Sequence, residues 1–302
     1  MSDQADHLRQ LVRQAVQARP TLGPGLPIIV LSGGSSGVGT TSLALQLARE
    51  LARLGKRTIL VDANFESPQL AAGFDARPHG CLADVLDGNR SANEVLQTVD
   101  DGISLLASGP ITDTSPDLSR TAVARLITEL RSLGEQADLV LVDAGHGMTP
   151  WVQRWWRVAQ QIFLVVTEEE SVVKDSYVTV KLAPWGDADG KLRLVVNKCE
   201  DRSTAEQITN RFSATCRRFL GLHVDAAPSV ATCDDDPSSP AAIATYRDSV
   251  RLLATDVISH NVIVSGRITN QTTNRGGRVA DMIAVPEKSF ESSNNLQAAP
   301  HE

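Results

Sequence analysis

The sequence predicts an α/β fold built on a doubly wound, mainly parallel β-sheet. Short and almost wholly apolar runs alternate along the chain with longer segments of helical periodicity. Such runs are typical of strands covered by helices on both faces, and their alternation with helices is typical of parallel sheets. Hydrophobic residues make up 42% of the 302 residues and charged residues 22%, which are ordinary values for a globular chain.

The expected elements follow one another from residue 27 onward. Strands are predicted at 27–32, 57–62, 103–108, 137–144, 161–168 and 191–198, and helices at 40–55, 84–99, 121–133, 204–221 and 241–258. Gly55 closes the first of these helices, which is the position that glycine commonly takes at a helix C-terminus. Together these elements predict one domain over residues 28–258.

Two segments flank this domain. Residues 1–20 carry apolar side chains at helical spacing and predict a separate helix, followed by a Gly/Pro-rich linker at 21–27. Residues 259–302 are rich in Ser, Asn and Gln and show no sustained period, so we expect a disordered tail.

Charge and cysteine usage narrow the class of protein. There are 29 basic and 36 acidic residues, and the net charge of −7 argues against a protein dedicated to nucleic acid. No apolar run approaches the roughly 18 residues of a membrane span, and the first residues lack the apolar segment of a signal peptide. The cysteines lack the spacing of a metal site and are expected to be reduced thiols: Cys81, Cys199, Cys216 and Cys233. We therefore expect a cytoplasmic protein.

A glycine-rich stretch, GGSSGVGTTS at 33–42, lies between the first strand and its helix. The phosphate-loop template G-x-x-x-x-G-K-[ST] occurs in that same context. Gly34 and Gly39 take its glycine positions and Thr41 takes the Mg²⁺-ligating position, but Thr40 stands where the template has lysine. Main-chain N–H groups can still cradle an anion, although a threonine supplies no charge-assisted contact. The loop therefore predicts weak nucleotide binding without hydrolysis, and the alternative is a turn kept for packing. The expected cofactor-binding residues of this loop are Gly34, Ser35, Ser36, Gly37, Val38, Gly39, Thr40, Thr41 and Ser42.

Carboxylates end two of the predicted strands beside this loop. Asp62 ends the strand at 57–62 and Asp143 ends the strand at 137–144, so with Thr41 they are candidate, weak Mg²⁺ ligands. Asn64 follows two residues after Asp62, and its amide cannot act as a base at neutral pH. His146 is a candidate base, although such a histidine is more often a solvated loop residue.

Taken together, these motifs resemble those of the MinD/ParA group of P-loop ATPases over residues 27–258. The chain has SSGVGTT (35–41), LVDAN (60–64) and LVLVDAG (139–145) where the group reads KGGVGKT, LVDAD and DYVLVDTP. The resemblance implies an ATP or ADP site with Mg²⁺, in which Asn197 of LVVNKCED reads the adenine.

The chain departs from that pattern at the charged positions of the site. By the same resemblance, Ser35 replaces the signature lysine, Thr40 the loop lysine and Asn64 the catalytic carboxylate. No catalytic residue is then intact, although Asp62 remains. Each lost charged hydrogen bond is worth about 1.5–3 kcal/mol, so we expect ATP to bind at least roughly a hundredfold more weakly and hydrolysis to be lost.

Within the group, the chain is most similar to the FlhG family, the MinD-like regulators of flagellar number and placement that are also called FleN or YlxH. The similar stretches are DQADHLR (3–9), TEEESVVKDSY (167–177) and RRFLGLHVDAAPSVATCDDD (217–236). The resemblance implies that the N-terminal helix docks onto FlhF, an SRP-type GTPase, and stimulates its hydrolysis. A helix that packs on the chain's own body is the alternative. The expected partner-binding residues are Asp3, Gln4, Ala5, Leu8 and Arg9.

We therefore expect a regulator that acts by partner binding in flagellar assembly or placement and that can form a homodimer. The tail offers no membrane-targeting helix, so recruitment to the inner membrane would pass through partners. The main alternative is an active ATPase switch that cycles between monomer and dimer. An iron–sulfur reductase of the nitrogenase iron-protein type needs paired cysteines that are not offered, and the acidic balance disfavours ParA-type DNA binding. The tryptophans Trp151, Trp155 and Trp156 share one predicted helix face, either as core or as a partner-binding patch.

Overall fold

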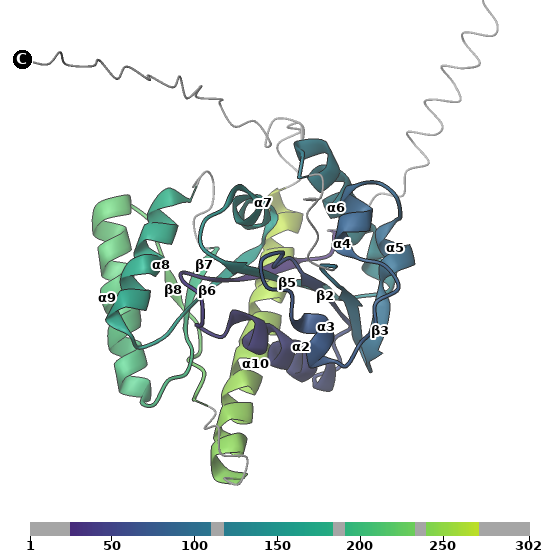
Figure 1. Cartoon of the computed structure of the whole chain (residues 1–302). Helices are drawn as coiled ribbons and strands as arrows, with labels where there is room; N and C mark the ends of the chain where they lie inside the picture. Colours follow the sequence, from purple (N-terminus) through teal and green to yellow (C-terminus); the bar gives the residue numbers. More distant parts are fainter. Residues whose placement is uncertain (1–24, 110–117, 184–190, 233–239, 272–302) are drawn as a thin grey trace, which may run out of the picture.

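The computed structural model of the chain describes residues 25–109, 118–183, 191–232 and 240–271 (Figure 1). The predicted N-terminal helix, with Asp3, Gln4, Ala5, Leu8 and Arg9, lies outside these residues. So do most of the predicted linker, Cys233 and residues 272–302 of the predicted tail.

Within the described ranges, eight strands form one sheet in the order β3-β4-β2-β5-β1-β6-β7-β8. They are β1 (Ile28–Gly33), β2 (Thr58–Asp62), β3 (Gln97–Asp100), β4 (Ile103–Leu106), β5 (Leu139–His146), β6 (Gln161–Val166), β7 (Leu192–Val196) and β8 (Asp225–Ala226). All neighbouring strands are parallel except β3 and β4, which are antiparallel. The predicted α/β fold with a mainly parallel sheet is confirmed.

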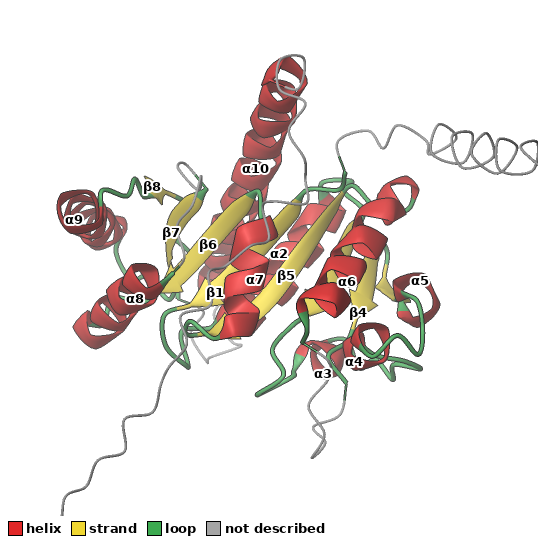
Figure 2. Ribbon diagram, turned by 90° about the horizontal axis from the view of Figure 1, so that it is seen from above, coloured by secondary structure: helices red, strands yellow, loops and turns green. Residues whose placement is uncertain are grey.

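Helices cover both faces of this sheet, with α6, α7 and α8 in front of it and α10 behind it in Figure 2. The helices are α2 (Thr40–Arg53), α3 (Leu70–Gly73), α4 (Leu82–Leu86), α5 (Ala92–Val95), α6 (Arg120–Ser132), the 3₁₀ turn η1 (Leu133–Glu135), α7 (Pro150–Val158), α8 (Glu170–Leu182), α9 (Arg202–Leu220) and α10 (Pro240–Gln271). Every residue of β1, β2, β6 and β7 is buried, as the continuous apolar runs predicted. In α2 the buried side chains include Leu43, Leu47 and Leu51, one face of an amphipathic helix.

Residues 84–99, expected as helix, form the end of α4, the short helix α5 and most of β3. Gly88 has a left-handed φ of 78° just beyond α4, so that helix ends early. After α5 the chain turns into β3, in which half-buried and exposed residues alternate. Gln97 pairs with Leu105 of β4 in an antiparallel register. Exposure along β3 therefore alternates with the two-residue period of a strand, and this segment at the edge of the sheet is not helical.

The last helix is longer than the sequence pattern indicated. The predicted domain boundary at residue 258 falls inside α10, which continues to Gln271. No proline interrupts residues 241–271, so nothing in the backbone chemistry stops the helix at that boundary. Its residues 259–271 belong to the segment expected as a tail.

A buried cation fastens α10 to the sheet. Arg193 in β7 is only 4% exposed, and its guanidinium forms an ion pair with Asp256 of α10. The same group donates a hydrogen bond of 2.8 Å to the Ala226 carbonyl oxygen of β8 and lies 5.4 Å from the ring centre of Phe163 in β6. One side chain thus links β6, β7, β8 and the last helix.

Candidate functional site

The glycine-rich loop connects the end of β1 to the start of α2. Gly37 and Gly39 have left-handed φ angles of 77° and 87°, which side chains other than glycine rarely adopt. Gly34 packs closely against α8, because a Cβ placed on it would lie 2.5 Å from the Cα atom of Ser176. The two glycines of the template therefore have different roles: Gly34 allows close packing against α8, and Gly39 allows the turn into α2.

This loop lines a cavity of about 590 Å³. Most of the residues expected to bind the cofactor lie together there: Ser35, Ser36, Gly37, Val38, Gly39, Thr40, Thr41, Ser42 and Asn197. Gly34 is the exception, since it faces α8 instead. Asn64, Gly145 and His146 line the same cavity from the ends of β2 and β5.

The two lysine positions of the family pattern hold neutral side chains inside this cavity. Thr40 is 7% exposed, and its hydroxyl oxygen lies 2.9 Å from where a Cβ on Gly33 would be. Ser35 is half-buried. Among the described residues that line the cavity, Lys198 is the one lysine or arginine. The phosphate loop itself therefore contributes no positive side-chain charge.

Asp62 and Asp143 lie side by side at the ends of β2 and β5, where they are register partners. Both are buried. Burial, and then the neighbouring Asp143 carboxylate, raise the pKa of Asp62 to about 7. Burial also raises the pKa of Asp143, while the nearby Thr41 hydroxyl and the Gly145 N–H oppose that rise. Without a cation, ionising both of these neighbouring buried carboxylates costs a large amount of free energy.

The hydrogen bonds of these carboxylates differ. The Asp62 oxygens accept the N–H groups of Asn64 at 3.3 Å and Leu70 at 3.1 Å, which fixes the segment after β2. Asp143 Oδ1 accepts the Gly145 N–H at 3.1 Å, whereas its buried Oδ2 has no hydrogen-bond partner among the described residues.

A hard cation such as Mg²⁺ suits this set of donors, because carboxylate and hydroxyl oxygens are the ligands it prefers. Asp143, Asp62 and Thr41 would hold it, and it would neutralise part of the charge of a bound phosphate. In the described residues no three His, Cys, Asp or Glu side chains gather as a metal cluster. Water and phosphate oxygens would therefore have to complete the coordination.

Asn64, which the resemblance places at the catalytic carboxylate position, lies just beyond the end of β2. Its Oδ1 accepts the Ser67 N–H at 3.2 Å, and its side chain lies 3.0 Å from where a Cβ on Gly145 would be. The amide thus closes a local turn and packs on the β5 loop. It has no basic atom with which to activate water.

Asn197 and Lys198 follow β7 and contact the loop from the other side of the cavity. The Asn197 Nδ2 group donates to the Val38 carbonyl oxygen at 2.8 Å, and Lys198 Nζ donates to the Gly37 carbonyl oxygen at 2.9 Å. The sequence analysis placed Asn197 at the site but overlooked Lys198. Its position directly after Asn197 at a strand end was the signal that could have found it.

The tryptophan cluster belongs to the core. Trp151, Trp155 and Trp156 are 6%, 1% and 3% exposed, so the alternative of an exposed partner-binding patch is wrong. Trp151 also serves the site, because its indole N–H donates to the Ala63 carbonyl oxygen at 2.7 Å. That bond fixes the main chain between Asp62 and Asn64.

His146 is the last residue of β5 and lines the cavity. It is half-buried, and its Nε2 atom lies 3.9 Å from a carboxylate oxygen of the exposed Glu66. That position agrees with a solvated loop histidine.

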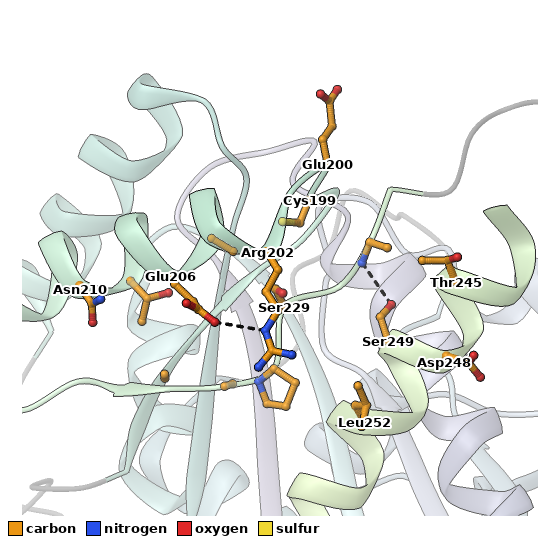
Figure 3. Close-up of a pocket in the computed structure, with 16 residues that line it drawn as sticks. Cys199, Glu200, Arg202, Glu206, Asn210, Ser229, Thr245, Asp248, Ser249 and Leu252 are labelled. Carbon is orange, nitrogen blue, oxygen red and sulfur yellow. Dashed lines mark hydrogen bonds and ion pairs between the residues drawn. The ribbon is translucent and has the colours of Figure 1, made fainter. Parts of the chain in front are cut away.

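A second and larger cavity, of about 960 Å³, lies between α9 and α10 beside the short strand β8 (Figure 3). Two hydrogen bonds lie within it: Arg202 donates to Glu206 at 3.1 Å, and Ser249 Oγ accepts the main-chain N–H of Ala231 at 3.1 Å. It shares none of the phosphate-loop residues, so the chemistry described above belongs to the smaller cavity.

The described cysteines lie on separate elements, with Cys81 at the start of α4, Cys199 after β7 and Cys216 in α9. Among the helices that the structure describes, none combines the length and apolar character that crossing a membrane requires.

A family model described as cellulose biosynthesis protein BcsQ matches residues 26–231, which include the whole loop, both carboxylates and Asn197. The chain belongs to this BcsQ family. The BcsQ family is of the MinD/ParA type, so the predicted membership in that group of P-loop proteins is confirmed.

Named relatives agree with this membership. The antiactivator FleN of Pseudomonas aeruginosa is 28% identical over 195 residues, which are 65% of this chain and 70% of FleN. The flagellum site-determining protein YlxH of Helicobacter pylori is 21% identical over 154 residues, and the match covers about half of each protein, 51% and 52%.

The septum site-determining protein MinD of Pyrococcus horikoshii, solved in complex with Mg-ADP, shares the fold of this BcsQ-family chain. The TM-score is 0.57, with 16% identity, over 79% of this chain and 98% of that protein.

Proposed function

We propose that this BcsQ-family chain is a MinD/FlhG-like regulator that acts by binding partner proteins and does not hydrolyse ATP. The supporting observation is that Ser35, Thr40 and Asn64 meet in one cavity where the family pattern has two lysines and a carboxylate. Without the two lysines and the carboxylate, the site lacks charged side chains that would stabilise the transferred phosphate and orient the attacking water.

In this proposal the site still binds ATP or ADP with Mg²⁺, but weakly. The backbone cradle is present, and the partner-free Asp143 Oδ2 supports a place for the cation, together with Asp62 and Thr41. In this view the nucleotide is a bound ligand that can favour one conformation or a homodimer, and it is not hydrolysed.

The proposed partner is an SRP-type GTPase of the FlhF kind, contacted through residues 1–20 by Asp3, Gln4, Ala5, Leu8 and Arg9. The proposed process is flagellar assembly or placement, supported by the likeness to FleN and YlxH. The protein would work in the cytoplasm and reach the inner membrane only through such partners.

The description of the family favours a second candidate process, the assembly of a cellulose-producing system. Deletion of the gene in its own organism distinguishes the two. Altered flagellar number supports the first process, and loss of cellulose staining with normal flagella supports the second.

Turnover is the direct test against the alternative of an active ATPase switch. The purified full chain should release no phosphate from Mg-ATP above the background of a Thr41→Ala variant. Restoring Ser35→Lys and Thr40→Lys together should tighten ATP binding at least roughly a hundredfold, because two charged contacts return. Robust hydrolysis by the wild-type chain, lost in Thr41→Ala, would instead establish the switch.

Partner binding is tested separately. The full chain should accelerate GTP hydrolysis by the cognate FlhF-like GTPase, and a variant with Gln4, Leu8 and Arg9 changed to alanine should not. Gln10→Ala on the same segment is the matched control. Equal acceleration by all three proteins would contradict the proposed contact.

A further inference from the structure

Two consecutive residues after β7 hold two consecutive peptide groups of the phosphate loop. Lys198 Nζ donates to the Gly37 carbonyl oxygen, and Asn197 Nδ2 donates to the Val38 carbonyl oxygen. In a planar trans peptide, the C=O of one residue and the N–H of the next point in opposite directions. Fixing these two carbonyls therefore also fixes the direction of the Val38 and Gly39 N–H groups.

The loop needs this external support because its own chemistry supplies little. Gly37 and Gly39, which flank Val38, lie in the left-handed region, and glycine has the largest choice of backbone conformations. A loop lysine that could organise the peptides around a bound phosphate is replaced by the buried Thr40. The two hydrogen bonds therefore restrict the rotation of both peptide groups, in addition to the buried side chain of Val38.

The main chain of Lys198 supports a particular role for this residue. Its φ of 55° is left-handed, one of two such angles at residues other than glycine in the described chain. Strained backbone of this kind persists where the surrounding structure fixes it, often at ligand sites. Asn197 is 6% exposed and packs against Gly39, so that a Cβ on Gly39 would lie 2.6 Å from Asn197 Nδ2. Asn197 thereby anchors the turn from which Lys198 reaches the loop.

We propose that Lys198 is a positioning residue of the nucleotide site: by holding the Gly37 carbonyl, it keeps the loop N–H groups directed at the phosphates of a nucleoside di- or triphosphate in the absence of a loop lysine. The inference rests on the proposed function, since it concerns how the same non-hydrolysing site retains its ligand. Lys198 acts here through the loop peptide and does not itself touch the phosphate.

The experiment measures binding of Mg-ADP and Mg-ATP to the full chain by calorimetry. Lys198→Met keeps the length of the side chain but removes the donor, and Lys198→Arg keeps a donor. Lys181→Met, an exposed lysine on α8, is the matched control for lost charge. Lys198→Met should weaken both nucleotides by about tenfold or more, because a hydrogen bond from a charged donor is lost. Lys198→Arg and Lys181→Met should bind as the wild type does.

A second readout separates positioning from a purely structural effect. Amide hydrogen exchange of residues 33–42 in the nucleotide-free protein should accelerate in Lys198→Met, while its thermal unfolding midpoint stays that of the wild type. Unchanged affinity in Lys198→Met would overturn the inference, and so would a wild-type chain that binds neither nucleotide. Neither result touches the proposed partner binding, which is read from the GTPase assay. ATP hydrolysis by the wild-type chain would contradict the proposed function. The role of Lys198 would still be decided by the measured nucleotide affinities.

Discussion

Removing the partner of the buried cation should cost this protein a large part of its stability. Arg193 and Asp256 form an ion pair with side chains 5% and 18% exposed, and a second contact joins Arg193 Nη2 to Asp256 Oδ1 at 3.1 Å. In the Asp256→Ala variant, the guanidinium stays buried and keeps its hydrogen bond to the Ala226 carbonyl oxygen. Breaking a buried pair from one side costs about 3–5 kcal/mol. Since Asp256 keeps some contact with water, we expect a loss near the lower end, about 3 kcal/mol.

The measurement is urea unfolding followed by circular dichroism. Asp256→Ala should lower the free energy of unfolding by that amount without changing the denaturant dependence much. The double variant Arg193→Met/Asp256→Leu should lose less than the single one, because it leaves no unpaired charge in the interior. Glu170→Ala breaks the exposed pair with Lys174 and serves as the control, with little expected change. A loss under about 1 kcal/mol in Asp256→Ala would refute the reasoning that this buried cation depends on its partner.

Further predictions concern the site. Burial and a neighbouring carboxylate raise the pKa of Asp62 to about 7, against about 3.9 in an unfolded chain. The folded protein then binds more protons between these values, so this contribution to stability is lost as the pH rises from about 4 to about 7. In Asp62→Asn, the free energy of unfolding should fall less steeply between about pH 4 and about pH 7, and the difference over this range should be at most about 4 kcal/mol. Urea unfolding without Mg²⁺ measures this dependence. The same pH dependence in the wild type and the variant would contradict the prediction. Gly34→Ala should lower the unfolding midpoint, since its Cβ would come within 2.5 Å of the Ser176 Cα atom, and Ser176→Gly should not rescue a backbone clash of this kind. Trp151→Phe should cost about 1 kcal/mol through the lost bond to the Ala63 carbonyl; no change in unfolding would show that this bond is dispensable.

The fold was readable from the sequence because its central strands are buried on both faces. Runs such as residues 28–33 and 161–166 contain few polar side chains, and polarity is the property that distinguishes such strands from loops. Two edge strands, β3 and β8, were not predicted from the sequence, for the same physical reason. β3 is half exposed and β8 has two residues, so neither carries enough apolar side chains to be recognised.

The site shows where sequence reasoning stops. The position of Thr40 in the loop followed from the spacing of the template, because a phosphate loop is a local structure. Ser35 and Asn64 were placed by the resemblance to the MinD/ParA motifs. The contacts of Lys198 followed from neither, since Gly37 lies 161 residues away in the chain and only the parallel order of β1, β6 and β7 brings them together. The burial of the tryptophans also depends on tertiary packing, which helical spacing leaves open.

The pattern of what is kept and what is lost in this cavity bears on its use. A site abandoned altogether would have no need for glycines at two strained loop positions, or for an asparagine and a lysine that hold the peptides between them. The neutral residues at 35, 40 and 64 remove charges that matter most when the β–γ bond breaks, and the main-chain cradle that recognises a resting phosphate is untouched. Binding and catalysis use different parts of a phosphate loop, and the proposed function assigns only binding to this chain. The γ-phosphate adds the charge that the missing lysines would have met. We therefore expect the wild-type chain to have a higher Kd than the variant with both lysines restored, and this increase should be smaller for Mg-ADP than for Mg-ATP.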